Sequence, residues 1–173
     1  MGLDTSVSLQ IFNKKEKTTF AEIDVAYWRK HWGLDNELRW NARKSEYWLG
    51  ENSGERADDY MTTCSPDVLD CWIDYIISIL KDIEANEWAN CLWDAIEARE
   101  YTCSQLARLL TTQTITQLGF NEYSLELYND QARESARLDY KDEEAYTLKE
   151  PELKKILDNP EDYEWRIIFI SSY

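Results

Sequence analysis

The chain has 173 residues, which is enough for one domain with a sizeable hydrophobic core, and we expect a single domain over residues 1–173. Hydrophobic residues make up 43% of the chain, with eight Trp and eleven Tyr, and this composition excludes an intrinsically disordered protein. The formal net charge of −15 disfavours direct binding of nucleic acid, because an acidic surface repels phosphates.

The negative charge is unevenly distributed along the chain. Residues 1–48 hold eight basic and seven acidic residues, whereas residues 49–173 hold 11 basic and 27 acidic residues. Such a surface favours a protein partner with a basic surface. The longest apolar run, WIDYIISIL, is far shorter than the roughly 20 residues of a membrane span, and the N-terminus has no basic leader. We therefore expect a cytoplasmic location and no membrane partner.

The first predicted elements are a strand and two helices. Residues 3–11 alternate apolar and polar side chains with the period of two that is typical of a half-buried strand, and the polar stretch NKKEK predicts a turn after it. The stretch FAEIDVAYWRKHW predicts a helix, with Asp24 as the candidate cap and Gly33 as its end, from spacings of three and four between Ile23, Ala26, Tyr27, Lys30 and Leu34. We expect a short helix over residues 35–48 and then a loop over residues 49–59.

The strongest helix signal in the chain begins at Pro66. Ser65 is suited to be the N-cap, and Pro66 is suited to the first helical position. The polar side chains form one narrow stripe, so we expect this helix in the centre of the core; the stripe consists of Asp67, Asp70, Asp74, Ser78 and Lys81. An unbroken helix to residue 100 would be about 50 Å long, which is too long for this domain and predicts a break near residues 84–90.

Three further helices and a strand complete the predicted fold. The helices are expected over residues 104–112, 123–138 and the short stretch KEPELKKIL, and the strand over EWRIIFISSY. Between the first two helices we expect an ordered connection and not a surface that recognises a partner. Gly119 permits a tight turn there, and Phe120 anchors it. The threonines of the preceding run belong to this connection: Thr111, Thr112, Thr114 and Thr116. The fold class is α+β, mostly α-helical, with a helical core and a small sheet that pairs the N- and C-terminal strands.

The four cysteines do not indicate a metal site or a disulfide framework. Cys64, Cys71, Cys91 and Cys103 form no C-x-x-C motif, and the chain has one histidine to complete a zinc set. We expect reduced thiols in the core and no cofactor.

Several segments resemble one family of proteins encoded in tailed phages and prophages. They are the opening MGLD, the stretch VAYWRKH at residues 25–31, the segment LLTTQ followed by GF and EYSLELYND at residues 109–130, and the aromatic final strand with SSY. The chain departs from the family in an additional helical stretch over residues 84–101 and in Asp35, where the family has a histidine. The resemblance implies a phage or prophage setting and a helix at the AYWRK segment. It assigns no catalytic activity and no functional residues.

Two groups of residues in the sequence could form a catalytic site. Acidic residues at helical spacing resemble the magnesium site of all-α nucleoside triphosphate pyrophosphatases, which gives the alternative of a metal-dependent nucleotide hydrolase; these residues are Glu84, Glu87, Asp94 and Glu97, with Glu100 in the same series. A charge run of this kind is more often a solvated helix face.

The aromatic and basic residues around His31 could form an acid–base site, but no nucleophile is tied to them by spacing.

The C-terminal third offers the densest acidic segment. Ten acidic residues and four lysines lie between residues 139 and 164, a net charge of −6. We expect a non-enzymatic phage accessory protein that binds a host or bacterial protein. Its acidic surface would mimic nucleic acid and so inhibit a defence system. The simpler interpretation is that the acidic surface only keeps the protein in solution. The candidate contact residues are Asp139, Asp142, Glu143, Glu144, Glu150, Glu152, Asp158, Glu161 and Asp162.

Overall fold

The protein is described by a computed structural model, which defines residues 4–29, 31, 33–34, 60–64, 66–85 and 92–172. The elements follow in the order β1 (Asp4–Asn13), β2 (Thr18–Arg29), β3 (Tyr60–Cys64), α2 (Pro66–Ala85), α3 (Leu92–Leu118), α4 (Glu122–Leu138), α5 (Glu143–Tyr146), α6 (Glu150–Asp158), the 3₁₀ helix η1 (Pro160–Asp162) and β4 (Tyr163–Ser172). The predicted class, α+β and mostly helical, is confirmed.

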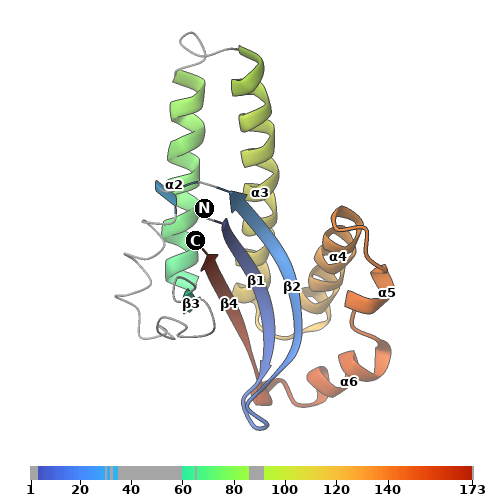
Figure 1. Ribbon diagram of the computed structural model, residues 1–173. Coiled ribbons are helices and arrows are strands. Elements are labelled where there is room, and N and C mark those ends of the chain that lie inside the picture. The colour runs from blue at the N-terminus through green and yellow to red at the C-terminus, as the bar shows by residue number, and fades with distance from the viewer. Residues whose placement is uncertain are drawn as a thin grey trace.

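The two terminal strands pair with each other, as the sequence predicts. The sheet has the order β2-β1-β4-β3, and every neighbouring pair is antiparallel. Asp4 lies opposite Ser172 and Asn13 lies opposite Tyr163, so β1 and β4 pair along their whole length. The two ends of the chain consequently lie side by side (Figure 1).

The helix predicted over the stretch FAEIDVAYWRKHW is wrong for residues 20–29, because they belong to strand β2. The register with β1 shifts between Val7 and Ser8, which leaves Val25 as an additional residue opposite that step. The buried positions therefore fall at Ile23, Val25, Ala26 and Trp28, a pattern that imitates helical spacing. The helix implied by the phage-family resemblance is corrected in the same way. The short helix and the loop predicted over residues 35–59 lie outside the described residues.

Helices α2 and α3 form an antiparallel pair that extends beyond one end of the sheet (Figure 1). The helix start at Pro66 and the break after residue 84 are confirmed, since α2 ends at Ala85 and α3 begins at Leu92; the expected N-cap, Ser65, lies outside the described residues. With 27 residues, α3 joins the helical stretch expected after the break to the predicted helix over 104–112, and it continues to Leu118. No described helix has both the length and the apolar character that crossing a membrane requires.

The threonine-rich run is part of α3, so the predicted connection is confined to the turn after it. The hydroxyls of Thr111, Thr112 and Thr114 donate to carbonyls four residues earlier in the same helix, at 2.9–3.1 Å. Gly119 follows with a φ of 69°, which a residue with a side chain rarely adopts. Phe120 stacks on Trp165 with 4.5 Å between ring centroids, so this turn is anchored to β4 as predicted.

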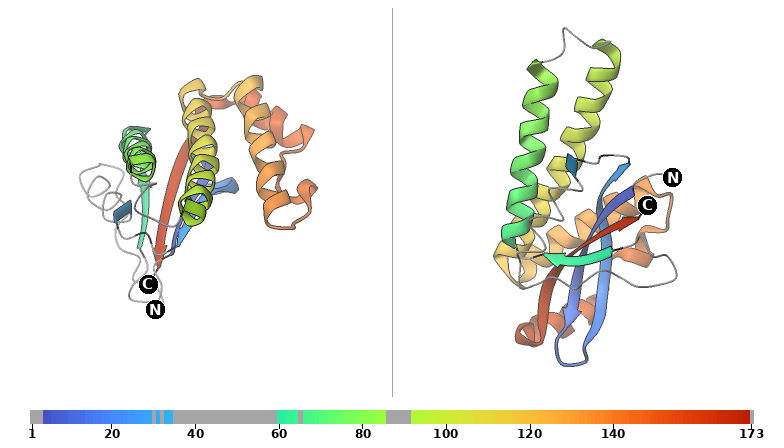
Figure 2. Two further views of the ribbon diagram at one scale, coloured as in Figure 1. Left: turned by 90° about the horizontal axis from the view of Figure 1, so that it is seen from above. Right: turned by 60° about the vertical axis from the view of Figure 1, so that its left-hand side comes forward.

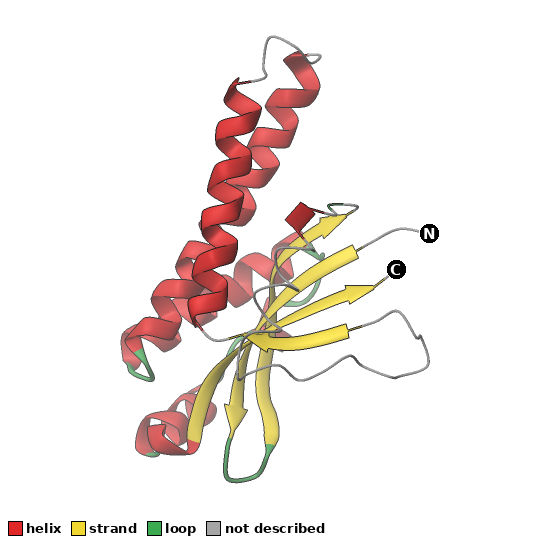
Figure 3. Ribbon diagram, turned by 90° about the vertical axis from the view of Figure 1, so that its left-hand side faces the viewer, coloured by secondary structure: helices red, strands yellow, loops and turns green. Residues whose placement is uncertain are grey.

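The helices cover one face of the sheet (Figures 2 and 3). At the centre of this layer, the Trp72 ring of α2 packs edge-on against Trp28 of β2 and Phe169 of β4, with centroids 4.9 and 5.0 Å apart. One cluster of buried side chains continues from there through Leu109 of α3 and Tyr128 of α4. Helix α2 is thus a core helix, although Cys71 and three residues of its polar stripe, Asp74, Ser78 and Lys81, are exposed to solvent.

Side chains of α3 cover the outer edge of β2. The backbone N–H of Tyr27 donates to Gln105 Oε1 at 3.1 Å, and its carbonyl accepts a hydrogen bond from the Tyr101 hydroxyl. Arg108 Nη2 donates to the Asp24 carbonyl at 2.5 Å. Because unpaired strand edges promote pairing with other chains, these contacts protect β2 from edge-to-edge association.

The described cysteines are free thiols. Cys71 and Cys103 form no disulfide, but both are exposed, so the expectation that they lie in the core is wrong. In α2 the buried face consists of Leu69, Trp72, Ile73 and Ile76, and Cys71 falls outside this stripe. The side chain of Cys64 and the whole of Cys91 lie outside the described residues.

Candidate functional site

The candidate contact residues all lie in one segment, residues 139–162, which comprises α5, α6, η1 and their connections. We call this segment the acidic arm; it holds nine acidic residues and four lysines. Figure 1 shows it on the side of α3 that is opposite to α2, continuing from α4 toward the lower end of the sheet.

Helix α4 connects the core to the acidic arm. It begins with a capping box in which Asn121 Oδ1 accepts from the Ser124 N–H at 2.8 Å and the Ser124 hydroxyl accepts from the Asn121 N–H at 3.0 Å. Its buried face carries Leu125 and Tyr128 onto the core, and burial raises the pKa of the Tyr128 hydroxyl. Packing of the buried face therefore fixes the position of α4, and the capping box stabilises its first turn.

Three contacts hold the acidic arm against the rest of the molecule. The Asn129 side chain of α4 accepts from the Leu148 N–H at 2.8 Å and donates to the Leu148 carbonyl at 3.2 Å, which fixes the connection between α5 and α6. The Lys155 ammonium group lies 5.6 Å from the centroid of the Phe20 ring in β2. The N–H of Lys14, in the β1–β2 turn, donates to the Asp162 carbonyl at 2.8 Å.

Four of the acidic residues are engaged within the arm, two as helix caps and two in ion pairs. Asp142 caps α5 by accepting from the Glu144 N–H at 3.0 Å, and Glu152 accepts from the Lys149 N–H at 2.7 Å at the start of α6. Asp139 lies 3.7 Å from the Lys141 ammonium group, and Glu144 lies 3.9 Å from that of Lys149. These exposed pairs contribute little to stability, but they neutralise part of the charge.

The other five acidic residues form no ion pair with a described residue. They are Glu143, Glu150, Asp158, Glu161 and Asp162. All except Asp162, which is half-buried, are exposed to solvent. The arm thus presents several carboxylates whose charge is not offset by a neighbouring cation within the described structure.

A groove of about 650 Å³ lies between α4 and α6. One face of each helix lines it, and the apolar part of the lining comes from Leu125, Leu153 and Leu157. Leu125 is buried, whereas Leu153 and Leu157 are half-buried and remain partly accessible. Asn129 also lines the groove, and its amide is held in place by the two hydrogen bonds to Leu148. The walls are therefore well fixed.

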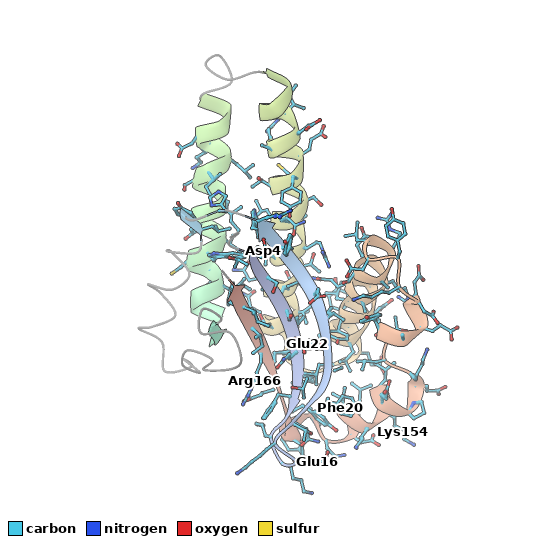
Figure 4. All side chains as sticks on the ribbon, viewed as in Figure 1. Asp4, Glu16, Phe20, Glu22, Lys154 and Arg166 are labelled. Atoms are coloured by element: carbon cyan, nitrogen blue, oxygen red, sulfur yellow. The ribbon has the colours of Figure 1, made fainter. Side chains whose placement is uncertain are left out.

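The groove has an acidic rim. The two cations among its lining residues are Arg133 and Lys154 (Figure 4). Arg133 is already paired with Asp130 at 2.8 Å. Four carboxylates line the groove, and no ion pair between described residues engages them: Glu122, Glu126, Glu150 and Asp158. An uncharged or cationic occupant is therefore favoured over an anionic one.

Among these lining residues, only Glu150 and Asp158 were candidates from the sequence. The leucines of α6 are four residues apart, as are Leu125 and Asn129 of α4, so each pair shares a helix face. This spacing indicates a common face on each helix. It does not indicate that the two faces lie opposite each other.

The residues of the alternative metal site lie on the α2–α3 helix pair or outside the described part. Glu84 is near the end of α2, Asp94 is near the start of α3, and Glu97 is exposed on α3, whereas Glu87 lies outside the described residues. In the part of the chain that the structure describes, no three His, Cys, Asp or Glu residues are grouped so as to hold a metal ion. The metal-dependent hydrolase stays a prediction from the sequence.

The residues around His31 are separated by the strand geometry. Trp28 is 5% exposed and belongs to the core, whereas Tyr27 and Arg29 point to the other face of β2. His31 Nδ1 accepts from the Leu34 N–H at 3.1 Å, and burial lowers the pKa of the imidazole. This histidine stabilises the local backbone, while Lys30 and Trp32 lie outside the described residues.

Comparison with models of protein families, with curated proteins and with solved structures gives no match. The phage-family resemblance accordingly remains a prediction from the sequence. The functional argument depends on the charge and shape of the acidic arm and of the groove beside it.

Proposed function

We propose that the protein is a non-enzymatic phage accessory protein that acts in the bacterial cytoplasm by binding a host protein with a basic surface. The observation that carries the proposal is the set of exposed carboxylates on the acidic arm that form no ion pair with described residues. These groups are available to a basic partner without first breaking an ion pair inside the protein. The phage setting comes from the sequence resemblance.

A nucleic-acid-binding protein provides the kind of surface that the arm requires. Its binding groove is lined by Lys and Arg that neutralise phosphates, and carboxylates on a folded surface offer those cations an alternative set of anions. Occupation of such a groove would exclude the nucleic acid. The proposed role is therefore inhibition by mimicry, with a nucleic-acid-dependent defence factor of the host as the target.

The test begins with capture of partners from bacterial lysate by the tagged full-length protein. Association of a recovered partner is then measured at 0.1 M and at 1 M salt, where the Debye length falls from about 10 Å to about 3 Å. Electrostatic attraction accelerates association, so the association rate constant should fall at high salt. Equal rates at the two salt concentrations would contradict the proposal.

Charge reversal locates the effect on the arm. The arm variant Glu143→Lys/Glu150→Lys/Glu161→Lys changes exposed residues without ion pairs and leaves the caps Asp142 and Glu152 intact. We expect it to slow association by about tenfold or more, a typical range for rim charges at an electrostatically steered interface.

A matched control separates the arm from the net charge. The control variant Asp74→Lys/Glu97→Lys/Glu100→Lys makes the same change in net charge on exposed positions of α2 and α3. It should slow association much less than the arm variant does. If the two variants slow association equally, the net charge of the protein and not the arm accounts for the effect; if neither slows it, the charge of the arm only keeps the protein in solution.

A further inference from the structure

We propose that the groove between α4 and α6 binds an amphipathic, basic segment of the partner protein. Apolar side chains of that segment would lie against Leu153 and Leu157, and its Lys or Arg residues would pair with the carboxylates at the rim. This inference rests on the proposed function, because it identifies where the basic partner is recognised and by which chemistry.

The size and preorganisation of the groove support such an occupant. A volume of about 650 Å³ lies within the range of about 300–1,000 Å³ of typical binding pockets. Its walls are two regular helices, and the Asn129–Leu148 hydrogen bonds hold the chain between them in place. A site with fixed walls loses little conformational entropy when it binds, which favours affinity.

The leucines distinguish this site from the remainder of the acidic surface. Leu153 and Leu157 stay partly accessible in the free protein, so an apolar side chain of the partner can remove their remaining surface from water. Amphipathic helices are commonly recognised in hydrophobic grooves through apolar anchors spaced three or four residues apart. A ligand with charge alone would leave the leucines exposed and would gain nothing from them.

The charges at the rim of the groove determine which charge the bound segment can carry. The rim carboxylates Glu122, Glu126, Glu150 and Asp158 outnumber the cations, of which Arg133 is already paired with Asp130. An acidic segment, or the phosphates of a nucleic acid, would be repelled. A segment with Lys or Arg beside its apolar anchors matches both features of the groove.

Two labelled peptides of 12 residues test the inference with the full-length protein at physiological salt. One contains Lys and Arg with two leucines four residues apart, and the other has serine in place of both leucines. We expect the leucine peptide to bind about tenfold more tightly or better, since burial of one large apolar side chain is worth at least this factor. An acidic version of the leucine peptide should not bind detectably.

Two charge variants determine where the peptide binds. Glu126→Lys/Asp158→Lys alters the rim of the groove, and Glu143→Lys/Glu161→Lys makes the same charge change on the arm outside it; all four residues are exposed. The groove variant should weaken binding of the leucine peptide by about tenfold, while the control should change it by no more than about threefold, because the Debye length is about 8 Å at this salt concentration.

A third variant tests the apolar contact. In Leu157→Ser the preference for the leucine peptide over the serine peptide should largely disappear, whereas the serine peptide should bind as it does to the unchanged protein. Thermal unfolding of each variant identifies any loss of fold, in which case Leu153→Ser replaces Leu157→Ser. Both leucines are half-buried, so one of the two substitutions is expected to leave the fold intact.

The outcomes separate the groove from the proposed function. If both basic peptides bind equally well, or if neither binds, the groove inference is overturned, while the proposed function is still decided by the association rates of the captured partner. Self-association that the groove variant abolishes would also overturn it, since the occupant would then be a second copy of this chain. If the peptides behave as expected but the arm charges leave partner association unchanged, the proposed function is the part that fails.

Discussion

The buried layer beneath the sheet and the acidic arm differ in whether their polar side chains have partners within the protein. In the layer, Thr112 Oγ1 donates to the Arg108 carbonyl at 2.9 Å and accepts from Gln131 Nε2 at 3.2 Å, because an unpaired hydroxyl in the interior is costly. On the arm, Glu143, Glu150 and Glu161 are exposed and form no ion pair with described residues. The first region holds the molecule in one geometry, and the second leaves charge available for a partner.

The largest effect is expected in the core. Trp72 is 1% exposed, contacts two aromatic rings and donates from Nε1 to the Leu34 carbonyl at 3.3 Å. Trp72→Ala leaves a cavity and should lower the free energy of unfolding by about 3–5 kcal/mol, measured by urea denaturation. Trp72→Phe retains one ring and should cost clearly less. A loss below about 1 kcal/mol for the alanine variant would show that this contact does not organise the core.

An intermediate effect is expected at the start of α4, where the core and the arm are joined. Asn121→Ala removes the hydrogen bond that the Asn121 side chain accepts from the Ser124 N–H. It should lower the free energy of unfolding by about 1 kcal/mol. Asn121→Asp keeps an acceptor for the Ser124 N–H and should retain most of the stability. If the alanine and aspartate variants lose the same amount, the cap does not stabilise the helix.

The smallest effect on stability is expected from the arm. The arm variant Glu143→Lys/Glu150→Lys/Glu161→Lys changes exposed side chains, so each substitution should change the free energy of unfolding by no more than about 0.5 kcal/mol. The measurement is the same urea denaturation, with the control triple variant of α2 and α3 beside it. A loss comparable to that of Trp72→Ala would mean that these carboxylates are part of the fold, and the contrast between the two regions would be lost.

The sequence predicts local structure best where one periodicity is unbroken. The terminal strands alternate regularly, and their pairing follows because each strand needs a partner for its backbone groups. The starts of α2 and α6 were also predicted, because Pro66 and Pro151 mark the first turn of each helix. The start of α4 was expected at Tyr123, next to its observed start at Glu122. Strand β2 was missed because the register shift beside Val25 interrupts the period of two.

The last part of α3, residues 113–118, was missed for a different reason. β-Branched threonines are weak helix formers, and a run of them next to Gly119 suggests a connection. In the fold, Thr112 and Ile115 are buried on the core side of α3, so tertiary packing overrides the local preference. The cysteine prediction failed similarly, because the sequence does not specify which stripe of α2 faces the sheet at Cys71.

The sequence by itself determined the charge of this protein, the concentration of acidic residues in one segment, the fold class and the pairing of the chain ends, because these depend on composition and short-range periodicity. Tertiary structure decided which carboxylates act as caps or ion-pair partners and which stay available. It also decided that Leu125 and Leu153, 28 residues apart in the sequence, line one groove. That arrangement depends on how α4 and α6 pack on the sheet and on the Asn129–Leu148 hydrogen bonds between them, which are contacts between segments distant in sequence.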